Sequence, residues 1–193
     1  NKNNIRHILN GGNLASEAFF PPLKYLYWGT DLYHIKDILK NFSNFPMKTY
    51  PFISVFYHKV YLKFIRRFIL HLPLNYLNYN IKNAEKELEE IYGWKYYGQK
   101  HFESRFTRFY EGFWLPHRFN YDMRKIQYSS LIVSGQLKRE KAISLLKENP
   151  LSDIQIKNEF KFVANKLDIS EDELENLLNI PKKYYYDFKN RAV

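Results

Sequence analysis

The stretch from Gly93 to Arg139 constrains the fold most, because aromatic residues recur along it at the spacing of helical turns. It reads GWKYYGQKHFESRFTRFYEGFWLPHRFNYDMRKIQYSSLIVSGQLKR, with Lys, His, Glu, Ser, Thr and Arg between the aromatic side chains. A helical hairpin needs the aromatic residues for its core, but it does not need this particular polar set. We therefore predict helices at about 99–114 and 120–134 whose polar side chains have a further purpose.

The remainder of the chain is also predicted to be mainly helical. Helices are expected where apolar residues keep a helical spacing or where capping residues stand: at Asp31–Phe42, at Asn83–Tyr92 with Asn83 as N-cap and Gly93 as the stop, at 138–148, and after the capping box Ser170-x-x-Glu173 with its staple of Ile169 on Leu174. From Lys182 onward the chain is rich in Lys, Tyr and Asn, and we expect a surface tail.

One strand is predicted, at Ile5–Leu9, where a short apolar run ends in the turn Asn10-Gly11-Gly12-Asn13. A lone strand cannot form a sheet. Either this strand lies at the edge of a sheet made by residues outside the sequence, or the strand prediction is wrong. The first option agrees with the start of the chain, where Asn1–Asn4 lack a Met and a signal peptide. We therefore expect a piece of a larger protein.

The segment Tyr50–Leu72 is aromatic and basic, and it is long enough to cross a bilayer. Four cations and two histidines lie within it or at its end, and a membrane-spanning helix normally excludes such residues. We therefore expect an amphipathic surface or core helix that Pro73 ends.

Composition limits the class of protein. Hydrophobic residues make up 45% of the 193, so a buried core is expected. The formal charge of +10 points to anionic partners, among them nucleotides, sugar nucleotides, nucleic acids and membrane surfaces. The chain has no cysteine, which excludes disulfides, thiolate zinc sites and Cys nucleophiles within it. This absence agrees with a cytoplasmic location.

Two function classes stay open on charge and composition. A basic helical module could bind nucleic acid, although acidic residues at 85–90 and 171–175 interrupt any continuous basic stripe. A protein held at a membrane surface through Tyr50–Leu72 is the other possibility.

The first candidate site is the segment Asn10–Glu17, NGGNLASE, where glycines after a strand let backbone approach a ligand. Gly11 would permit that approach, and Asn13 and Glu17 would direct polar groups into a cleft. Glycine turns after strands are common, so an ordinary turn is the alternative. The segment lacks the lysine and the third glycine of the known phosphate-binding loops.

A second candidate follows from the spacing of Lys100, Ser104 and Arg108, which one helix would place on one side. Two cations and a hydroxyl suit a phosphate or pyrophosphate. The other side of that helix would bury its aromatic residues, Phe102, Phe106, Phe109 and Phe113. The alternative is a solvated face on which Glu103 and Glu111 pair with the cations.

Several further polar residues complete the candidates. Arg124 and Lys125 could reach a phosphate, while Asp122 could cap the next helix, and Ser129, Ser130 and Ser134 could serve either chemistry or close helix packing. His101 could be a polar active-site residue. His101 and His117 stand too far apart in sequence, without a nearby His partner, to indicate a zinc site. No metal ligand is predicted.

These motifs together resemble the C-terminal signature of the N-acetyl sugar amidotransferases, enzymes of the ATP-pyrophosphatase (PP-loop) type in lipopolysaccharide, O-antigen and surface-sugar biosynthesis. The matching positions are Gly93-Trp94, Tyr97-Gly98, Lys100-His101, Glu103-Ser104, Phe106-Thr107-Arg108-Phe109, Leu115-Pro116, Asp122, Arg124, Ser129-Ser130-Leu131-Ile132, Ser134-Gly135-Gln136 and Arg139. A weaker likeness covers the GGN-x-A-x-E segment with Pro21, Trp28 and Asp31.

The resemblance implies a fold and a reaction. Residues 1–46 would be the tail of an α/β nucleotide-binding domain and residues 47–193 a helical C-terminal domain. The whole enzyme would use ATP with Mg to adenylate the acetamido oxygen of a nucleotide-linked N-acetyl sugar, and ammonia would then displace AMP to leave an acetamidino group. Glutaminase-like and cyclase-like subunits would supply the ammonia.

The same resemblance defines the residues that would bind ATP, its phosphates or the sugar nucleotide: Gly11, Asn13, Glu17, Lys100, His101, Glu103, Ser104, Arg108, Arg124 and Lys125. The SGG-x-DS loop of such enzymes is absent from this sequence. The 193 residues would therefore be inactive without the remainder of the enzyme, and no nucleic acid or stable membrane insertion is implied.

Overall fold

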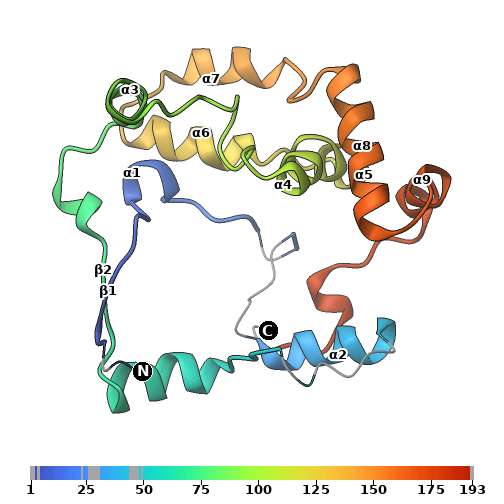
Figure 1. Cartoon of the computed structure of the whole chain (residues 1–193), viewed down its shortest axis with the longest axis horizontal. Coiled ribbons are helices and arrows are strands. Elements are labelled where there is room, and N and C mark those ends of the chain that lie inside the picture. Colours follow the sequence, from blue (N-terminus) through green and yellow to red (C-terminus); the bar gives the residue numbers. More distant parts are fainter. Residues whose placement is uncertain are drawn as a thin grey trace. The chain divides into compact units, whose positions relative to one another are not determined.

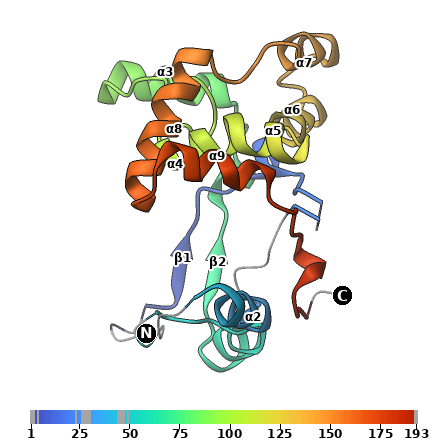
Figure 2. The same cartoon turned by 90° about the vertical axis from the view of Figure 1, so that its right-hand side faces the viewer.

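The computed structural model describes residues 3, 5–22, 24–25, 31–43, 48 and 50–191. These residues form a mainly helical protein with one two-stranded sheet, which confirms the predicted fold class (Figures 1 and 2). They group into two compact units. Unit 1 comprises Asn1–Gly12, Phe20–Leu77 and Lys182–Val193, and unit 2 comprises Asn13–Phe19 and Asn78–Pro181. The predicted division at residue 46 concerns a longer protein and stays a prediction.

Unit 1 contains a parallel sheet of two strands, β1 (His7–Leu9) and β2 (Ile69–His71), which run side by side in Figures 1 and 2. The predicted N-terminal strand is therefore confirmed. Its partner strand was not predicted, because β2 lies inside Tyr50–Leu72, the segment that was predicted as one helix. That segment instead forms the π-helix η1 (Tyr57–Ile65), and Arg67 ends the helical run in the left-handed conformation, with φ of 54°. The β-prone residues after Arg67 then extend into β2, before the 3-10 helix η2 (Pro73–Tyr76).

Helix α2 of unit 1 (Leu32–Phe42) begins one residue after the predicted start, Asp31, which is its N-cap. The Asp31 carboxylate is 1% exposed and accepts hydrogen bonds from the backbone of Tyr33 and His34, from Tyr185 Oη at 2.6 Å and from the Arg191 backbone at 2.8 Å. Tyr185, in the 3-10 helix η4 (Tyr185–Asp187), is itself buried. The expectation of a surface tail after Lys182 is therefore wrong at these residues, because the buried carboxylate binds them.

Asp31→Asn is expected to lower the free energy of unfolding by about 1.5–3 kcal/mol, the contribution of a hydrogen bond to a charged group. Burial acts to raise the pKa of Asp31, but the hydrogen bonds from Tyr185, Arg191, His34 and Tyr33 outweigh it and lower this pKa. The stabilisation is thus present above the unfolded-state pKa of about 3.9 and disappears as the pH falls through the lower folded-state pKa.

Urea denaturation at several pH values measures this effect. Removal of an exposed charge in Glu175→Gln should change the stability by less than about 0.5 kcal/mol. A difference between wild type and Asp31→Asn that stays constant down to the lowest pH would contradict the assignment.

Unit 2 is helical, and no strand follows residue 80 in the part of the chain that the structure describes. Its helices are α1 (Leu14–Glu17), α3 (Ile81–Tyr92), α4 (Arg105–Phe109), the π-helix η3 (Tyr110–Trp114), α5 (Leu115–Phe119), α6 (Arg124–Val133), α7 (Arg139–Leu146), α8 (Asp153–Leu167) and α9 (Glu171–Asn179). Gly93 ends α3 in the left-handed conformation, and Ser170 and Glu173 form the predicted capping box of α9.

Three helix predictions need correction. Asn80, not Asn83, caps α3, because its side chain accepts from the backbone of Lys82 and Asn83. The helix predicted at 99–114 begins only at Arg105, after its cap Ser104, and continues through η3 and α5 to Phe119. Helix α8 was not predicted, although Ser152 and Gln155 form a second capping box at its start.

The core of unit 2 forms where α4, α8 and α9 meet. Phe109, Val163, Ala164 and Leu174 are fully buried there, and Phe113, Trp114 and Ile169 pack around them. Gly112 passes so close to Leu151 that an added Cβ would lie 2.8 Å from the leucine side chain. The core therefore holds the run from α4 to α5 firmly and fixes the polar residues that this run carries.

Candidate functional site

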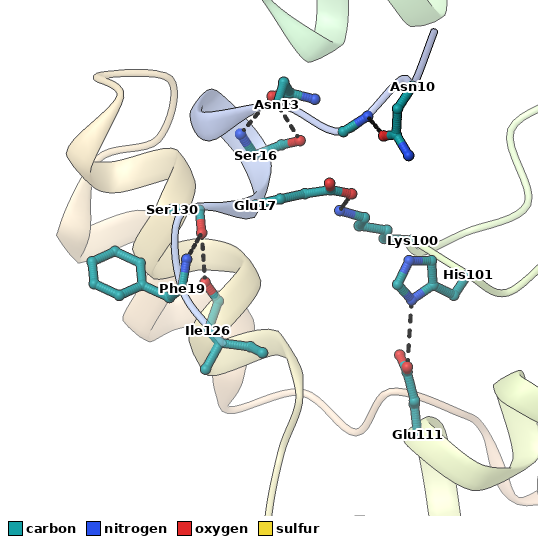
Figure 3. Close-up of polar contacts among 11 residues, drawn as sticks. Asn10, Asn13, Ser16, Glu17, Phe19, Lys100, His101, Glu111, Ile126 and Ser130 are labelled. Atoms are coloured by element: carbon teal, nitrogen blue, oxygen red, sulfur yellow. Dashed lines mark hydrogen bonds and ion pairs between the residues drawn. The ribbon is translucent and has the colours of Figure 1, made fainter. Parts of the chain in front are cut away.

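Helix α1 of unit 2 is held in place by polar contacts rather than by a large apolar face (Figure 3). Asn13, which is buried, caps the helix by accepting hydrogen bonds from the backbone and the hydroxyl of Ser16, at 2.9 and 3.1 Å. Two serines of α6 contact the same segment: Ser134 Oγ donates to the Ala15 carbonyl at 2.8 Å, and Ser130 Oγ accepts from the Phe19 backbone at 3.3 Å. The sequence left two roles open for these serines, chemistry and close helix packing. The observed contacts are those of close packing.

The carboxylate of Glu17, at the end of α1, pairs with Lys100 at 2.5 Å. Figure 3 shows the two side chains directed toward each other, Glu17 from α1 and Lys100 from the turn that precedes α4. Glu17 is more exposed than Lys100, so the pair lies at the surface with the cation partly covered. Two residues predicted for the site are thus in contact, although they stand far apart in the sequence.

Lys100, Ser104 and Arg108 do not share a helix face, because the helix begins only after Ser104. Ser104 caps α4 by accepting from the Thr107 backbone at 3.3 Å. Arg108 pairs with the buried Glu159 of α8 at 2.8 Å, and Arg105 binds the other oxygen of that carboxylate, also at 2.8 Å. The two cations predicted to converge on one phosphate therefore have separate partners.

The aromatic face was predicted in part. Phe102 and Phe109 are buried as expected, and Phe113 is partly buried against the core. Phe106 is 53% exposed, which corrects the expectation that it is buried. Phe102 lies before the helix starts, so a continuous helical stripe through Phe102, Phe106 and Phe109 does not exist.

Arg108→Ala is expected to lower the free energy of unfolding by about 1–3 kcal/mol, because the buried Glu159 loses one of its two charged partners. Chemical denaturation measures the change. The exposed Arg139 of α7 gives a matched control, for which Arg139→Ala should alter stability by less than about 0.5 kcal/mol. Equal stabilities for the two variants would show that Arg108 has no structural role.

His101 lies beside Lys100 on the same turn and contacts a second carboxylate. Its Nδ1 lies 3.4 Å from Oε1 of Glu111, a buried residue of η3 (Figure 3). His101 adopts a left-handed conformation with φ of 68°, which is uncommon outside glycine. The hydrogen bond to Glu111 raises the pKa of His101 above its ordinary value, against an opposing effect of burial. Glu111 was considered before only as an ion-pair partner on a solvated face.

Arg124 is buried and forms a bidentate pair with Asp122, from Nε to Oδ1 at 3.1 Å and from Nη2 to Oδ2 at 2.7 Å. It also donates to the Leu145 carbonyl at 3.2 Å. Asp122 in turn accepts from the Arg124 backbone at 2.9 Å, but Met123 and not Asp122 is the N-cap of α6. These contacts occupy the guanidinium, and Lys125 beside it is exposed.

The remaining candidates do not take part in these pairs. Gly11 is exposed and belongs to unit 1. Glu103 is exposed and hydrogen-bonded to Tyr97. Burial of Tyr97 and the Glu103 carboxylate both raise the pKa of Tyr97. Trp28 lies outside the described residues. His117 stacks on Phe113, and the described residues contain no group of three or more His, Asp or Glu that could hold a metal ion.

The comparison with known families matches almost half of the chain. Residues 103–192 match the family model described as "LPS biosynthesis protein WbpG-like, C-terminal domain". This segment resembles the C-terminal domain of WbpG-like LPS biosynthesis proteins. The match covers Glu111, Arg124 and the whole α4–α9 region, while Lys100 and His101 stand just before it. No curated protein matches the chain. No solved structure matches it.

Helix α1, the turn before α4 and η3 thus carry two neighbouring acid–base pairs, Lys100 with Glu17 and His101 with Glu111. One pair offers a cation at the surface, and the other offers an imidazole oriented by a buried carboxylate. Such groups can bind an anionic oxygen and transfer a proton. Among the described residues, no helix is both long and apolar enough to cross a bilayer.

Proposed function

We propose that this chain is the C-terminal part of an ATP-dependent amidotransferase that converts the N-acetyl group of a nucleotide-linked sugar to an acetamidino group during lipopolysaccharide biosynthesis. The observation that carries the proposal is the match of residues 103–192 to the C-terminal domain of WbpG-like LPS biosynthesis proteins. The sequence signature from Gly93 to Arg139, which resembles that of the N-acetyl sugar amidotransferases, supports the specific reaction.

The polar groups of unit 2 suit the sugar end of the substrate better than the ATP end. Arg108 and Arg124 are engaged by Glu159 and Asp122, and the described residues hold no carboxylate cluster that fits Mg. We therefore assign no step to a metal held by this chain. In the proposal, Mg and ATP bind to residues outside these 193, among them an SGG-x-DS loop, and the chain is inactive without them.

The sheet of unit 1 is consistent with ATP binding by residues outside these 193. The strands β1 and β2 are parallel, yet apolar residues on them, Ile8, Leu9, Ile69 and Leu70, are exposed. Parallel sheets are ordinarily covered on both faces. We propose that the two strands join a larger nucleotide-binding sheet in the complete enzyme, which is cytoplasmic and receives ammonia from glutaminase-like and cyclase-like partner subunits.

In the proposed reaction, Lys100 binds an anionic oxygen of the sugar nucleotide. Before the substrate binds, the ammonium group of Lys100 pairs with Glu17 at the surface. An exposed ion pair is weak, so the substrate oxygen can replace Glu17 as the partner of Lys100. Adenylation converts the acetamido oxygen into a good leaving group, and AMP departs when ammonia adds. The test is release of AMP and pyrophosphate by the longer enzyme that depends on a nucleotide-linked N-acetyl sugar. Sugar-independent release, or none, would contradict the proposal.

Lys100→Met in the longer enzyme is expected to lower kcat/KM for the sugar nucleotide by about 10- to 150-fold, the equivalent of a charge-assisted contact of about 1.5–3 kcal/mol. The fold should persist, because the ion pair with Glu17 is partly exposed and contributes about 0–1 kcal/mol. Steady-state kinetics with ammonia as nitrogen donor measure the effect without partner subunits.

Lys86 provides the matched control, since its pair with Glu90 on α3, at 3.7 Å, is fully at the surface. Lys86→Met should leave kcat/KM unchanged. If Lys100→Met behaves like this control, Lys100 belongs to a solvated face and does not bind substrate.

The membrane-surface alternative rests on a separate observation. Residues 38–84 contain no Asp or Glu, and their cations include Lys59 and Lys63 of η1. Exposed apolar side chains, Phe56, Phe64 and Ile65, lie among these cations. Such a surface could bind anionic lipid. Pelleting with anionic and with neutral vesicles tests this alternative, and equal or absent pelleting rejects it.

A further inference from the structure

His101 and Glu111 form a pair whose geometry resembles that of an oriented acid–base catalyst. Nδ1 of His101 faces Oε1 of Glu111 at 3.4 Å, and the carboxylate side chain is only 10% exposed. The imidazole itself is 47% exposed. A carboxylate that accepts a hydrogen bond from Nδ1 fixes the tautomer in which Nε2 is free to accept a proton. The reachable nitrogen is therefore the basic one.

The backbone of both residues is unusual, and the surrounding structure maintains it. His101 has a positive φ, a conformation that costs energy and that commonly marks functional positions. Glu111 lies in η3, and short π-helices are frequent at functional sites. Fixed neighbours on both sides of Glu111, Phe109 in the core and Gly112 against Leu151, hold the carboxylate in place.

The second carboxylate oxygen of Glu111, Oε2, is buried without a hydrogen-bond partner. A buried carboxylate so incompletely satisfied is costly for the fold, and a purely structural residue would be better replaced by an apolar one. The negative charge of Glu111 has a function if it stabilises the imidazole of His101, because that imidazole gains a positive charge whenever it accepts a proton.

We propose that His101 is the general base of the amidination step and that Glu111 is its positioning residue. This proposal rests on the proposed function. The lone pair of ammonia forms the C–N bond to the adenylated imidate carbon, and the C–O bond breaks with its electron pair leaving on AMP. The proton lost by the attacking nitrogen passes to Nε2 of His101. Lys100, on the same turn, neutralises the phosphate oxygens nearby.

The charged groups around the imidazole set the direction of its titration. Glu111 from η3 raises the pKa of His101 most, Lys100 lowers it and Glu103 raises it slightly, while burial lowers it. Lys100 is itself paired with Glu17 of α1. Loss of the Glu111 charge should therefore lower the pKa of His101, and the base should then be weaker and deprotonated at lower pH.

The experiment separates the two half-reactions of the longer enzyme. Sugar-dependent release of pyrophosphate without ammonia reports adenylation, and formation of the acetamidino sugar with ammonia reports the whole reaction. His101→Gln is expected to retain adenylation and to lose about 10²- to 10⁴-fold in amidination, the usual contribution of a general base. Glu111→Gln should lose less and should shift the acidic limb of the amidination profile to lower pH.

Glu175→Gln is the matched control, since Glu175 on α9 is exposed and belongs to neither pair. It should leave amidination nearly unchanged. NMR titration of the 193-residue chain supplies a readout that does not depend on activity: Glu111→Gln should lower the pKa of His101 and Glu175→Gln should leave it unchanged.

Equal loss of both half-reactions in His101→Gln, or full amidination in that variant, overturns the proposal. So does an unshifted pH profile in Glu111→Gln. If the wild-type enzyme releases no pyrophosphate with any nucleotide-linked N-acetyl sugar, it is the proposed function that fails, and the NMR titration then still decides whether Glu111 controls His101.

Discussion

The burial of Phe109 against α8 is the interaction on which the helical unit depends. Phe109 packs with Val163 and Ala164 of α8, and Glu159 of α8 binds Arg105 and Arg108 of α4. One apolar contact and one shared carboxylate thus join α4 to α8. The neighbouring turn with Lys100 and His101 and the following π-helix with Glu111 are positioned by this junction, so the candidate site is only as rigid as the core beneath it.

The π-helix is explained by the proline that follows it. Pro116 lacks an N–H and cannot donate to the Gly112 carbonyl, which would strain a regular helix at this point. The chain responds with a wider turn, in which the Leu115 N–H donates to the Tyr110 carbonyl five residues earlier. Glu111 lies within this wider turn and faces His101. The proline that interrupts the regular helix and the glutamate proposed to position His101 are therefore linked by local geometry.

Sequence reasoning predicted the helical class, the strand at the N-terminus, the stop at Gly93 and the capping box at Ser170, because each depends on a few neighbouring residues. It was wrong that one helix face carries both Lys100 and Arg108, because the start of a helix decides which side chains share a face, and this helix begins only after Ser104. It missed β2 and the Asp31–Tyr185 contact, since pairing between distant segments leaves no periodic pattern. Glu111 could have been noticed as a carboxylate among aromatic residues.

The central claim is that a WbpG-like domain takes part in replacing an acetamido oxygen by nitrogen. The most direct measurement is to supply the longer enzyme with ¹⁵N-ammonia, ATP and nucleotide-linked N-acetyl sugars, and to analyse the sugar product by mass spectrometry and NMR. The account predicts one ¹⁵N atom in an acetamidino group, with AMP formed in equal amount. Incorporation of ¹⁵N at another position of the sugar, or AMP formation with an unlabelled product, would contradict it.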